Sequence, residues 1–153
     1  MDLSMIRFAR VAKFGYVRVE TTGETACGSR PFPPLSCRHC LTDVPAGAPY
    51  LIVAHRPFEA LHPYAECGPL FVCADACARH PDGPDLPPIL TTSPDYLLKG
   101  YSADERIVYG TDKVVAQAGI AAYAAQVLDD PRVRHIHVRS ARNNCYQLRI
   151  APD

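Results

Sequence analysis

Four cysteines in two close pairs are the residues of this chain whose types and spacing could most readily do chemistry. Two residues separate Cys37 from Cys40, and three separate Cys73 from Cys77. Zinc takes four soft or borderline ligands in a tetrahedron, and two pairs of thiolates in one small domain supply such a set. The spacing therefore predicts a structural zinc ion bound by Cys37, Cys40, Cys73 and Cys77.

Other readings of the cysteines remain open from the sequence. Reduced cysteines are often buried as small hydrophobic side chains, and a pair such as Cys37 and Cys40 can also form a redox-active disulfide. No helix is expected directly after this pair, where a reactive thiolate would be stabilised, so a metal site is favoured over redox chemistry. Four further side chains could replace Cys73 or Cys77 as a ligand: His39, His62, Cys67 and His80.

A polar segment near the C-terminus is the second place where the residue types suggest chemistry. Arg139 and Arg142 could make bidentate contacts to a carboxylate or a phosphate, and Asn143 and Asn144 supply both donors and acceptors. The competing interpretation is structural, because Asn-Asn is favourable turn chemistry. We take these four residues as the candidate ligand-binding set.

Two arrangements would suit an enzyme. Cys145 could act as a nucleophile if His135 or His137, which share one face of their strand, lay close to it. Glu66 and His62 could serve acid–base catalysis, although both also suit structural roles beside a turn. The alternative to a binding protein is thus a thiol-dependent enzyme or redox protein that uses Cys145 or the pair Cys37 and Cys40.

Composition limits the class of protein. The 153 residues fit one domain, residues 1–153, and the 16 basic and 16 acidic residues cancel, so no strong field attracts nucleic acid. No apolar run approaches the roughly 18 residues needed to span a membrane, and the first residues do not resemble a secretory signal. Seven cysteines, an odd number, fit a reducing cytoplasm better than a disulfide framework. The sequence predicts a cytoplasmic protein whose partner is a small molecule or another protein.

Hydrophobic patterns predict an α+β fold with a mostly antiparallel sheet and one long helix. The helix is expected to begin at Thr111 or Asp112 and to end near Leu128, before Asp130-Pro131. The last two strands alternate around a polar turn at residues 140–144 and predict a hairpin. Fifteen prolines, concentrated between residues 31 and 98, predict long loops clipped by the zinc site. Strands are expected at residues 5–8, 16–19, 50–54, 70–72, 106–109, 133–139 and 146–150.

Several longer motifs resemble a bacterial family known as domain of unknown function 1203. They are Cys37-Arg38-His39-Cys40-Leu41, Pro63-Tyr64-Ala65-Glu66, Gly68-Pro69-Leu70-Phe71-Val72, Arg106-Ile107-Val108-Tyr109-Gly110 and the run from His137 to Gln147. The resemblance implies a small bacterial protein that stands alone as one domain, and it carries no activity, substrate or cofactor. It includes the run from Arg139 to Gln147, which favours a ligand-binding role for the hairpin.

Overall fold

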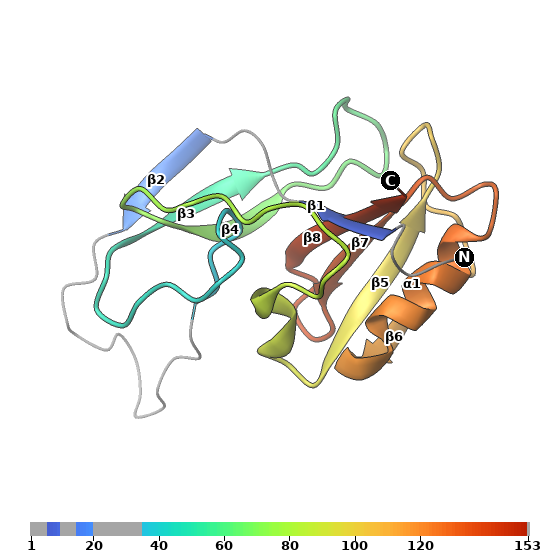
Figure 1. Ribbon diagram of the computed structural model, residues 1–153. Coiled ribbons are helices and arrows are strands. Elements are labelled where there is room, and N and C mark those ends of the chain that lie inside the picture. Colours follow the sequence, from blue (N-terminus) through green and yellow to red (C-terminus); the bar gives the residue numbers. More distant parts are fainter. Residues whose placement is uncertain (1–5, 10–14, 20–34, 153) are drawn as a thin grey trace.

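The computed structural model describes residues 6–9, 15–19 and 35–152 of the chain (Figure 1). Residues 31–34, the first part of the proline-rich region, lie outside this range. The described elements, of which η2 and η3 are short 3-10 helices, are β1 (Ile6–Ala9), β2 (Gly15–Val19), β3 (Tyr50–His55), β4 (Gly68–Cys73), η2 (Pro88–Thr91), β5 (Asp95–Tyr101), β6 (Lys113–Ala116), η3 (Gln117–Gly119), α1 (Ile120–Leu128), β7 (His135–Ser140) and β8 (Tyr146–Pro152).

The larger of two sheets has five antiparallel strands in the order β1-β8-β7-β5-β6. Helix α1 packs on one face of this sheet (Figure 1), and its buried residues join Ile136 and Val138 of β7 in one apolar cluster. Successive side chains of a strand point to opposite faces, so His135, His137 and Arg139 lie on the face away from the helix. The functional side chains of β7 therefore face the rest of the molecule.

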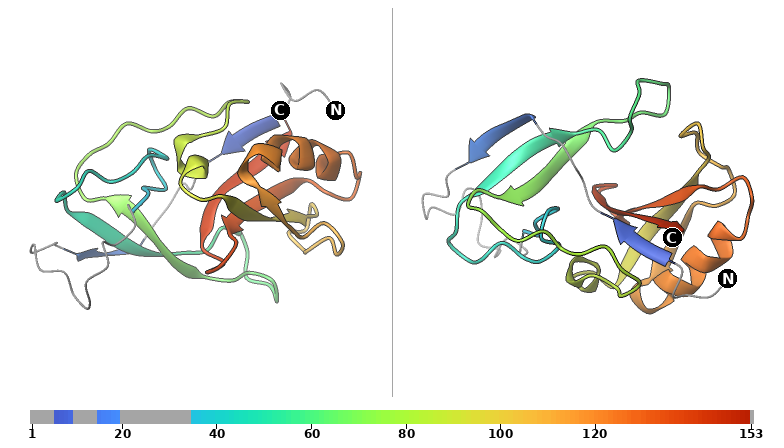
Figure 2. Two further views of the ribbon diagram at one scale, coloured as in Figure 1. Left: turned by 90° about the horizontal axis from the view of Figure 1, so that it is seen from below. Right: turned by 45° about the horizontal axis from the view of Figure 1, so that its top comes forward.

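The smaller sheet has three antiparallel strands in the order β2-β3-β4. It lies beside the larger sheet in all the ribbon views (Figures 1 and 2). Its own apolar cluster includes Val53, Leu70 and Val72 together with Cys37 and Tyr146. Because Tyr146 belongs to β8, this second cluster joins the two sheets. The α+β class and the antiparallel pairing expected from the sequence are confirmed.

The helix is shorter than predicted. Residues 113–116, expected in its first turn, form strand β6 instead, and α1 spans only Ile120–Leu128. Val115 pairs with Tyr96 of β5, and β-branched residues such as Val114 and Val115 favour an extended backbone. The helical spacing of small residues predicted the C-terminal end of the helix correctly. Its predicted start was wrong, because residues 113–116 pair with β5 as a strand.

Two further differences concern strands. The apolar run at residues 106–109 does not form a regular strand and contributes one isolated bridge, between Tyr101 and Ile107. The long strand β5 was not expected, because Pro94 precedes it and Lys99 and Gly100 interrupt its apolar pattern. The other expected strands are present in the structure within a few residues of the predicted bounds, including the hairpin of β7 and β8.

Gly100 shows how closely β5 packs on the segment that follows it. A Cβ atom at this position would lie 2.7 Å from Thr111 Oγ1 and 3.2 Å from Val127 Cγ1. The Gly100 amide also donates to Thr111 Oγ1 at 2.9 Å. We expect Gly100→Ala to lower the free energy of unfolding by about 1–3 kcal/mol, because overpacking forces these neighbours apart. Urea denaturation of the wild type and the variant measures this change in the free energy of unfolding.

Gly83 provides the matched control for this prediction. An added Cβ there meets no described atom within 4 Å. Gly83→Ala should therefore change stability by less than about 0.5 kcal/mol. Equal urea midpoints for the two variants would contradict the close packing at Gly100.

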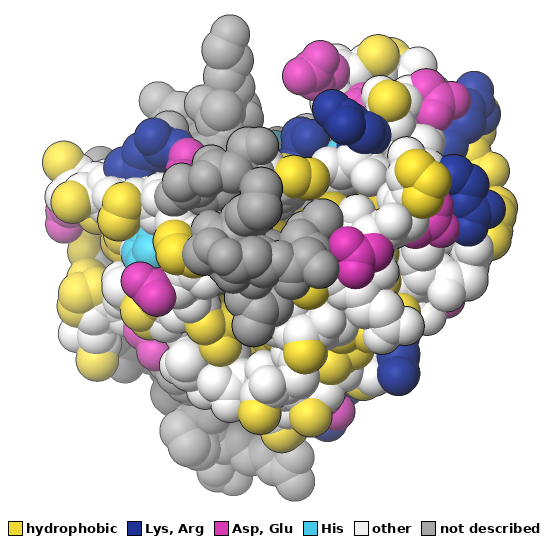
Figure 3. All heavy atoms as spheres, turned by 45° about the vertical axis from the view of Figure 1, so that its right-hand side comes forward, with side chains coloured by type: hydrophobic (Ala, Val, Ile, Leu, Met, Phe, Trp, Pro, Cys, Tyr) yellow, Lys and Arg dark blue, Asp and Glu magenta, His cyan; other side chains and the backbone are white. Residues whose placement is uncertain are grey.

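Acidic and basic side chains are interspersed on the face seen in Figure 3, and apolar ones are scattered among them. That face offers no single-sign patch of the kind that binds nucleic acid. Among the described residues, no helix has the length and apolar character needed to cross a membrane.

Candidate metal centre and ligand pocket

The first cysteine pair lies on a tight turn closed by the backbone. Ser36 and Asp43 form a bridge across its base, and the amide of Cys37 donates to the Thr42 carbonyl at 2.8 Å. The Leu41 amide donates to the Cys37 carbonyl at 3.0 Å, and Leu41 has a positive φ of 54°. This turn directs the side chains of Cys37 and Cys40 to one side.

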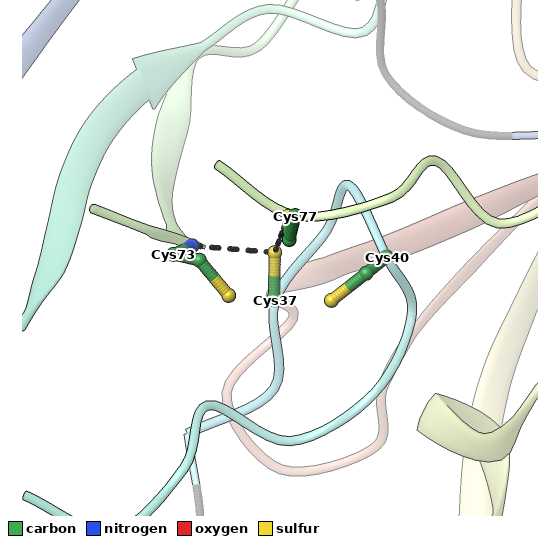
Figure 4. Close-up of side chains that lie close together, drawn as sticks. All are labelled: Cys37, Cys40, Cys73 and Cys77. Carbon is green, nitrogen blue, oxygen red and sulfur yellow. Dashed lines mark hydrogen bonds between the residues drawn. The ribbon is translucent and has the colours of Figure 1, made fainter. Parts of the chain in front are cut away.

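The second pair completes a set of four sulfurs. Cys73 ends β4 and Cys77 follows in the next loop, and the four sulfurs lie within 4.8 Å of one another. Figure 4 shows the side chains converging from the two segments. Tetrahedral Zn–S bonds of about 2.3 Å place sulfurs about 3.8 Å apart, and the Cys37–Cys77 sulfur distance is 4.0 Å. The arrangement therefore fits a four-coordinate metal ion, and no described cysteine is in a disulfide.

Backbone and side-chain donors surround the sulfurs. The amides of His39 and Cys73 approach Cys37 Sγ at 3.4 and 3.3 Å. His39 Nδ1 lies 3.2 Å from Cys77 Sγ. Such N–H groups stabilise metal-bound thiolates, because they offset their negative charge. In this arrangement His39 supports a sulfur ligand and does not replace it.

Burial and the neighbouring thiols oppose joint ionisation of the four cysteines. Burial, together with the nearby thiols of Cys37 and Cys40, raises the pKa of Cys77 to about 11. Burial and the same neighbours also raise the pKa of Cys73. Burial acts in the same sense on Cys40, but hydrogen bonds from Thr42 outweigh it and lower its pKa. Adjacent thiols resist joint ionisation unless a positive ion compensates their charge.

The other proposed ligands lie elsewhere. His80 Nδ1 lies 2.7 Å from the Pro81 carbonyl, at the edge of a groove beside the cysteines. His62 Nε2 faces Glu105 at 3.6 Å, and Cys67 lines a different pocket. The four cysteines are the one group of potential metal ligands that meets among residues 35–152.

Arg38 connects the cysteine turn to the hairpin. Its side chain is buried, its Nε donates to the Tyr146 carbonyl at 3.0 Å, and its Nη1 donates to the Ser36 carbonyl. Burial lowers the pKa of Arg38, whereas the nearby thiols of Cys145 and Cys37 oppose that shift. A buried guanidinium bound to carbonyls is favoured by a negative tetrathiolate beside it. The cysteine cluster and the hairpin thus share contacts with one buried arginine.

A pocket of about 200 Å³ lies where the two sheets meet, and we call it the junction pocket. The hairpin of β7 and β8 contributes one wall, and the segment that leads into β4 contributes the opposite wall. Its lining residues are His55, Pro57, Glu66, Cys67, Gly68, Pro69, Leu70, Arg139, Asn143, Asn144, Cys145 and Tyr146.

Arg139 and Glu66 bring opposite charges together in this pocket. Arg139 is 3% exposed, and its Nη2 lies 2.6 Å from Glu66 Oε1. Arg139 Nη1 donates to the Asn144 carbonyl at 3.1 Å, and Asn144 Nδ2 approaches Glu66 Oε2 at 3.4 Å. Arg139 Nε is buried without a hydrogen-bond partner among the described residues. An unpartnered buried donor is costly in a native protein and indicates a role for a further acceptor.

Behind the pocket, histidines and aromatic rings form a buried cluster. The His137 ring lies 4.4 Å from the ring of Tyr101, 5.0 Å from that of His135 and 5.1 Å from those of Phe58 and Tyr146. Burial, with smaller contributions from nearby His135, Arg139 and Arg149, holds the pKa of His137 well below its usual range. His137 is therefore neutral near pH 7, and Tyr146 connects this cluster to the lining of the pocket.

The chain was compared with family models, with curated proteins and with solved structures. Residues 34–151 match the model of the family described as a protein of unknown function (DUF1203). The chain belongs to this family. No curated protein and no solved structure gave a significant match.

In this DUF1203 protein the predicted ligand-binding set is only partly brought together. Arg139, Asn143 and Asn144 line the junction pocket, whereas Arg142 is exposed and pairs with Asp95 at 2.7 Å. Asn144 has a positive φ of 56°, which confirms the turn chemistry of the hairpin. The structural and ligand-binding interpretations of this segment are therefore compatible.

The residues considered for an enzyme have the following partners in the DUF1203 protein. Glu66 pairs with Arg139, and His62 faces Glu105. Cys145 Sγ donates to the Asn143 carbonyl at 3.7 Å. His135 and His137 belong to the buried aromatic cluster.

Sequence reasoning missed three residues of the site. His55 lines the pocket at the end of β3, and burial lowers its pKa to about 4. Arg38 links the metal centre to the hairpin, and Phe58 packs against the ring of His137. The motif around Cys37 and Cys40 contains Arg38, but only the fold shows that Arg38 reaches a strand 108 positions later.

Proposed function

We propose that this DUF1203 protein is a binding module for a small polar molecule, stabilised by a structural zinc ion. In this proposal Cys37, Cys40, Cys73 and Cys77 hold the zinc, and the junction pocket holds the ligand. The observation that carries the binding role is the burial of Arg139 in the pocket, where its Nε atom has no acceptor among the residues that the structure describes. The protein would work in the cytoplasm, where reducing conditions keep thiolate ligands intact.

Zinc is favoured over other metals by the donor set. Four thiolates with sulfurs close to tetrahedral spacing are typical of structural zinc sites, which leave no open coordination position. The proposed metal would link the turn that contains Cys37 and Cys40 to the end of β4. Cys37 belongs to the apolar cluster of the smaller sheet, and Cys40, Cys73 and Cys77 pack against it, so the metal would add to the stability of that cluster.

Metal content tests the first half of the proposal. Untagged protein purified without added metal should carry about one zinc ion per chain by native mass spectrometry. Denaturation should release the zinc and expose the thiols. Iron, or a disulfide between the paired cysteines, would contradict a structural zinc site.

Ligand screening tests the second half. The holoprotein is heated with standard amino acids, dicarboxylic acids, sugar phosphates and nucleosides, each at millimolar concentration, and unfolding is followed by fluorescence. Ligands that bind only the native state raise its unfolding temperature. At least one class should stabilise the wild type and fail to stabilise Arg139→Met. If no class raises the unfolding temperature, the binding role is wrong.

A further inference from the structure

The junction pocket presents one buried positive charge and one accessible negative charge. Arg139 is almost completely buried, whereas the Glu66 side chain is 42% exposed. Their charged atoms approach within 2.6 Å. A ligand that enters the pocket therefore meets both signs of charge at neighbouring positions.

Arg139 keeps one edge of its guanidinium underused. Nε and Nη2 share the edge that can bind a carboxylate through two parallel hydrogen bonds. Here Glu66 Oε1 contacts Nη2, while Nε remains buried without a partner in the described part of the chain. Glu66 therefore leaves the Nε donor of this edge unused.

Glu66 in turn keeps acceptor capacity. Its Oε1 faces Arg139, and its Oε2 has only a long contact of 3.4 Å to the amide of Asn144. A carboxylate offers about four acceptor positions, so a half-exposed Glu66 can receive a donor from a ligand. An ammonium group is the donor that its charge favours.

A ligand with a single charge would fit this pair poorly. A simple anion on Arg139 would lie beside the Glu66 carboxylate, and a simple cation on Glu66 would lie beside the Arg139 guanidinium. Like charges at such distances oppose binding. A zwitterion places its carboxylate and ammonium in alternation with the two protein charges, so every neighbouring pair attracts.

The volume and the lining residues of the junction pocket limit the class of ligand further. A volume of about 200 Å³ is below the range of pockets for drug-sized ligands, so the ligand is small. Pro57, Pro69 and Leu70 form an apolar wall, and burial keeps His55 neutral near pH 7. The rest of the ligand should therefore be compact and uncharged.

We infer that the junction pocket binds a small α-amino acid as its zwitterion, with the carboxylate on Arg139 and the ammonium on Glu66. This inference rests on the proposed function, since it names the ligand class of the same pocket. Asn143 and Asn144 supply further polar contacts at the rim.

Calorimetry with matched ligands tests this inference on the zinc-loaded protein. The standard L-amino acids are ranked first, and the best is compared with the analogues that lack its ammonium or its carboxylate. For alanine these are propionate and ethylamine. Each analogue should bind about tenfold more weakly or worse, because one protein charge loses its hydrogen-bonded partner.

Three variants separate the roles of the side chains. Glu66→Gln should weaken binding of the amino acid by about tenfold. The affinity of the variant for the amino acid should then be close to the affinity of the wild type for its deaminated analogue, which for alanine is propionate. Arg139→Met should abolish binding of both. Arg142→Ala, on the same hairpin but outside the pocket, should leave the affinity unchanged. Because Glu66 is half exposed, Glu66→Gln remains informative even if Arg139→Met folds poorly.

The outcomes separate the two proposals. Equal affinity for an amino acid and its deaminated analogue would overturn the zwitterion but leave a binding pocket in place. The same holds if only sugar phosphates or nucleosides stabilise the wild type. Absence of binding by every class would remove the binding role itself.

Discussion

Cys37→Ser is expected to abolish zinc binding and to lower the free energy of unfolding by several kcal/mol. Zinc binding energy becomes folding energy when the site does not exist in the unfolded chain. Cys37 is fully buried, and two backbone amides point at its sulfur. Because domains are stable by only about 5–15 kcal/mol, such a loss is a large share of the total. Denaturant unfolding with parallel zinc analysis measures both effects.

The structure also predicts where the loss of order begins. The cluster of Cys37, Val53 and Leu70 belongs to the three-stranded sheet, whereas α1 and β7 pack in a separate cluster. Hydrogen exchange of the variant should therefore lose protection first in β3 and β4 and later in β7. Cys67→Ser, an exposed cysteine outside the metal centre, is the matched control and should keep its zinc. Unaltered stability of Cys37→Ser would refute a structural metal.

Metal loss should also reach the junction pocket. Arg38 lies beside the Cys37 thiol and donates to the Tyr146 carbonyl, and Tyr146 lines the pocket. When the tetrathiolate charge is absent, the buried guanidinium loses part of the electrostatic compensation that Cys145 and Cys37 give it. The hairpin contact then weakens, and with it the wall that holds Arg139. The two sites proposed here are thus coupled through one side chain.

The cysteine cluster could be predicted from the sequence because its signal is local. Two short cysteine spacings define two turns, and only the meeting of the turns depends on the fold. The hairpin was predictable for the same reason, since alternation on both sides of Asn143-Asn144 fixes strands and turn together. Helix α1 was predicted with the right end but the wrong start, because β6 gains its strand only by pairing with β5.

The pocket could be predicted only in part. Arg139, Asn143 and Asn144 stand out as a polar segment, but nothing local pairs Arg139 with Glu66, which comes from a loop 73 residues earlier. Arg142 has the same residue type as Arg139 but a different environment. Arg139 lies within β7 and is buried, whereas Arg142 lies in the turn after β7, is exposed and pairs with Asp95. Residue type therefore predicts the kind of contact that an arginine can make. Only the long-range packing shows that Arg139, and not Arg142, lies in the pocket.

The buried histidine cluster makes the protein sensitive to acid. Burial lowers the pKa of His55 to about 4 and, aided by Arg149, that of His135 to about 3. Unfolded histidine titrates near 6.5, so below that pH the unfolded chain binds more protons than the folded one. Stability is therefore full above about pH 6.5 and falls as the pH drops, by up to about 1.4 kcal/mol per pH unit for each histidine. For His55 the loss stops near pH 4.

His135→Phe isolates this effect from acid loss of the metal, which weakens wild type and variant alike. The His135 ring is stacked on Tyr101 at 5.4 Å and 8°, and phenylalanine keeps a stacked ring without a titrating group. Urea unfolding at pH 7 and pH 5 should show that the variant loses about 2 kcal/mol less of its free energy of unfolding than the wild type. This figure corresponds to the uptake of one proton by the unfolded chain over about 1.5 pH units, from pH 6.5 to pH 5. An equal loss in both proteins would mean that His135 is protonated in the folded state, which contradicts its burial among neutral rings and cationic Arg149.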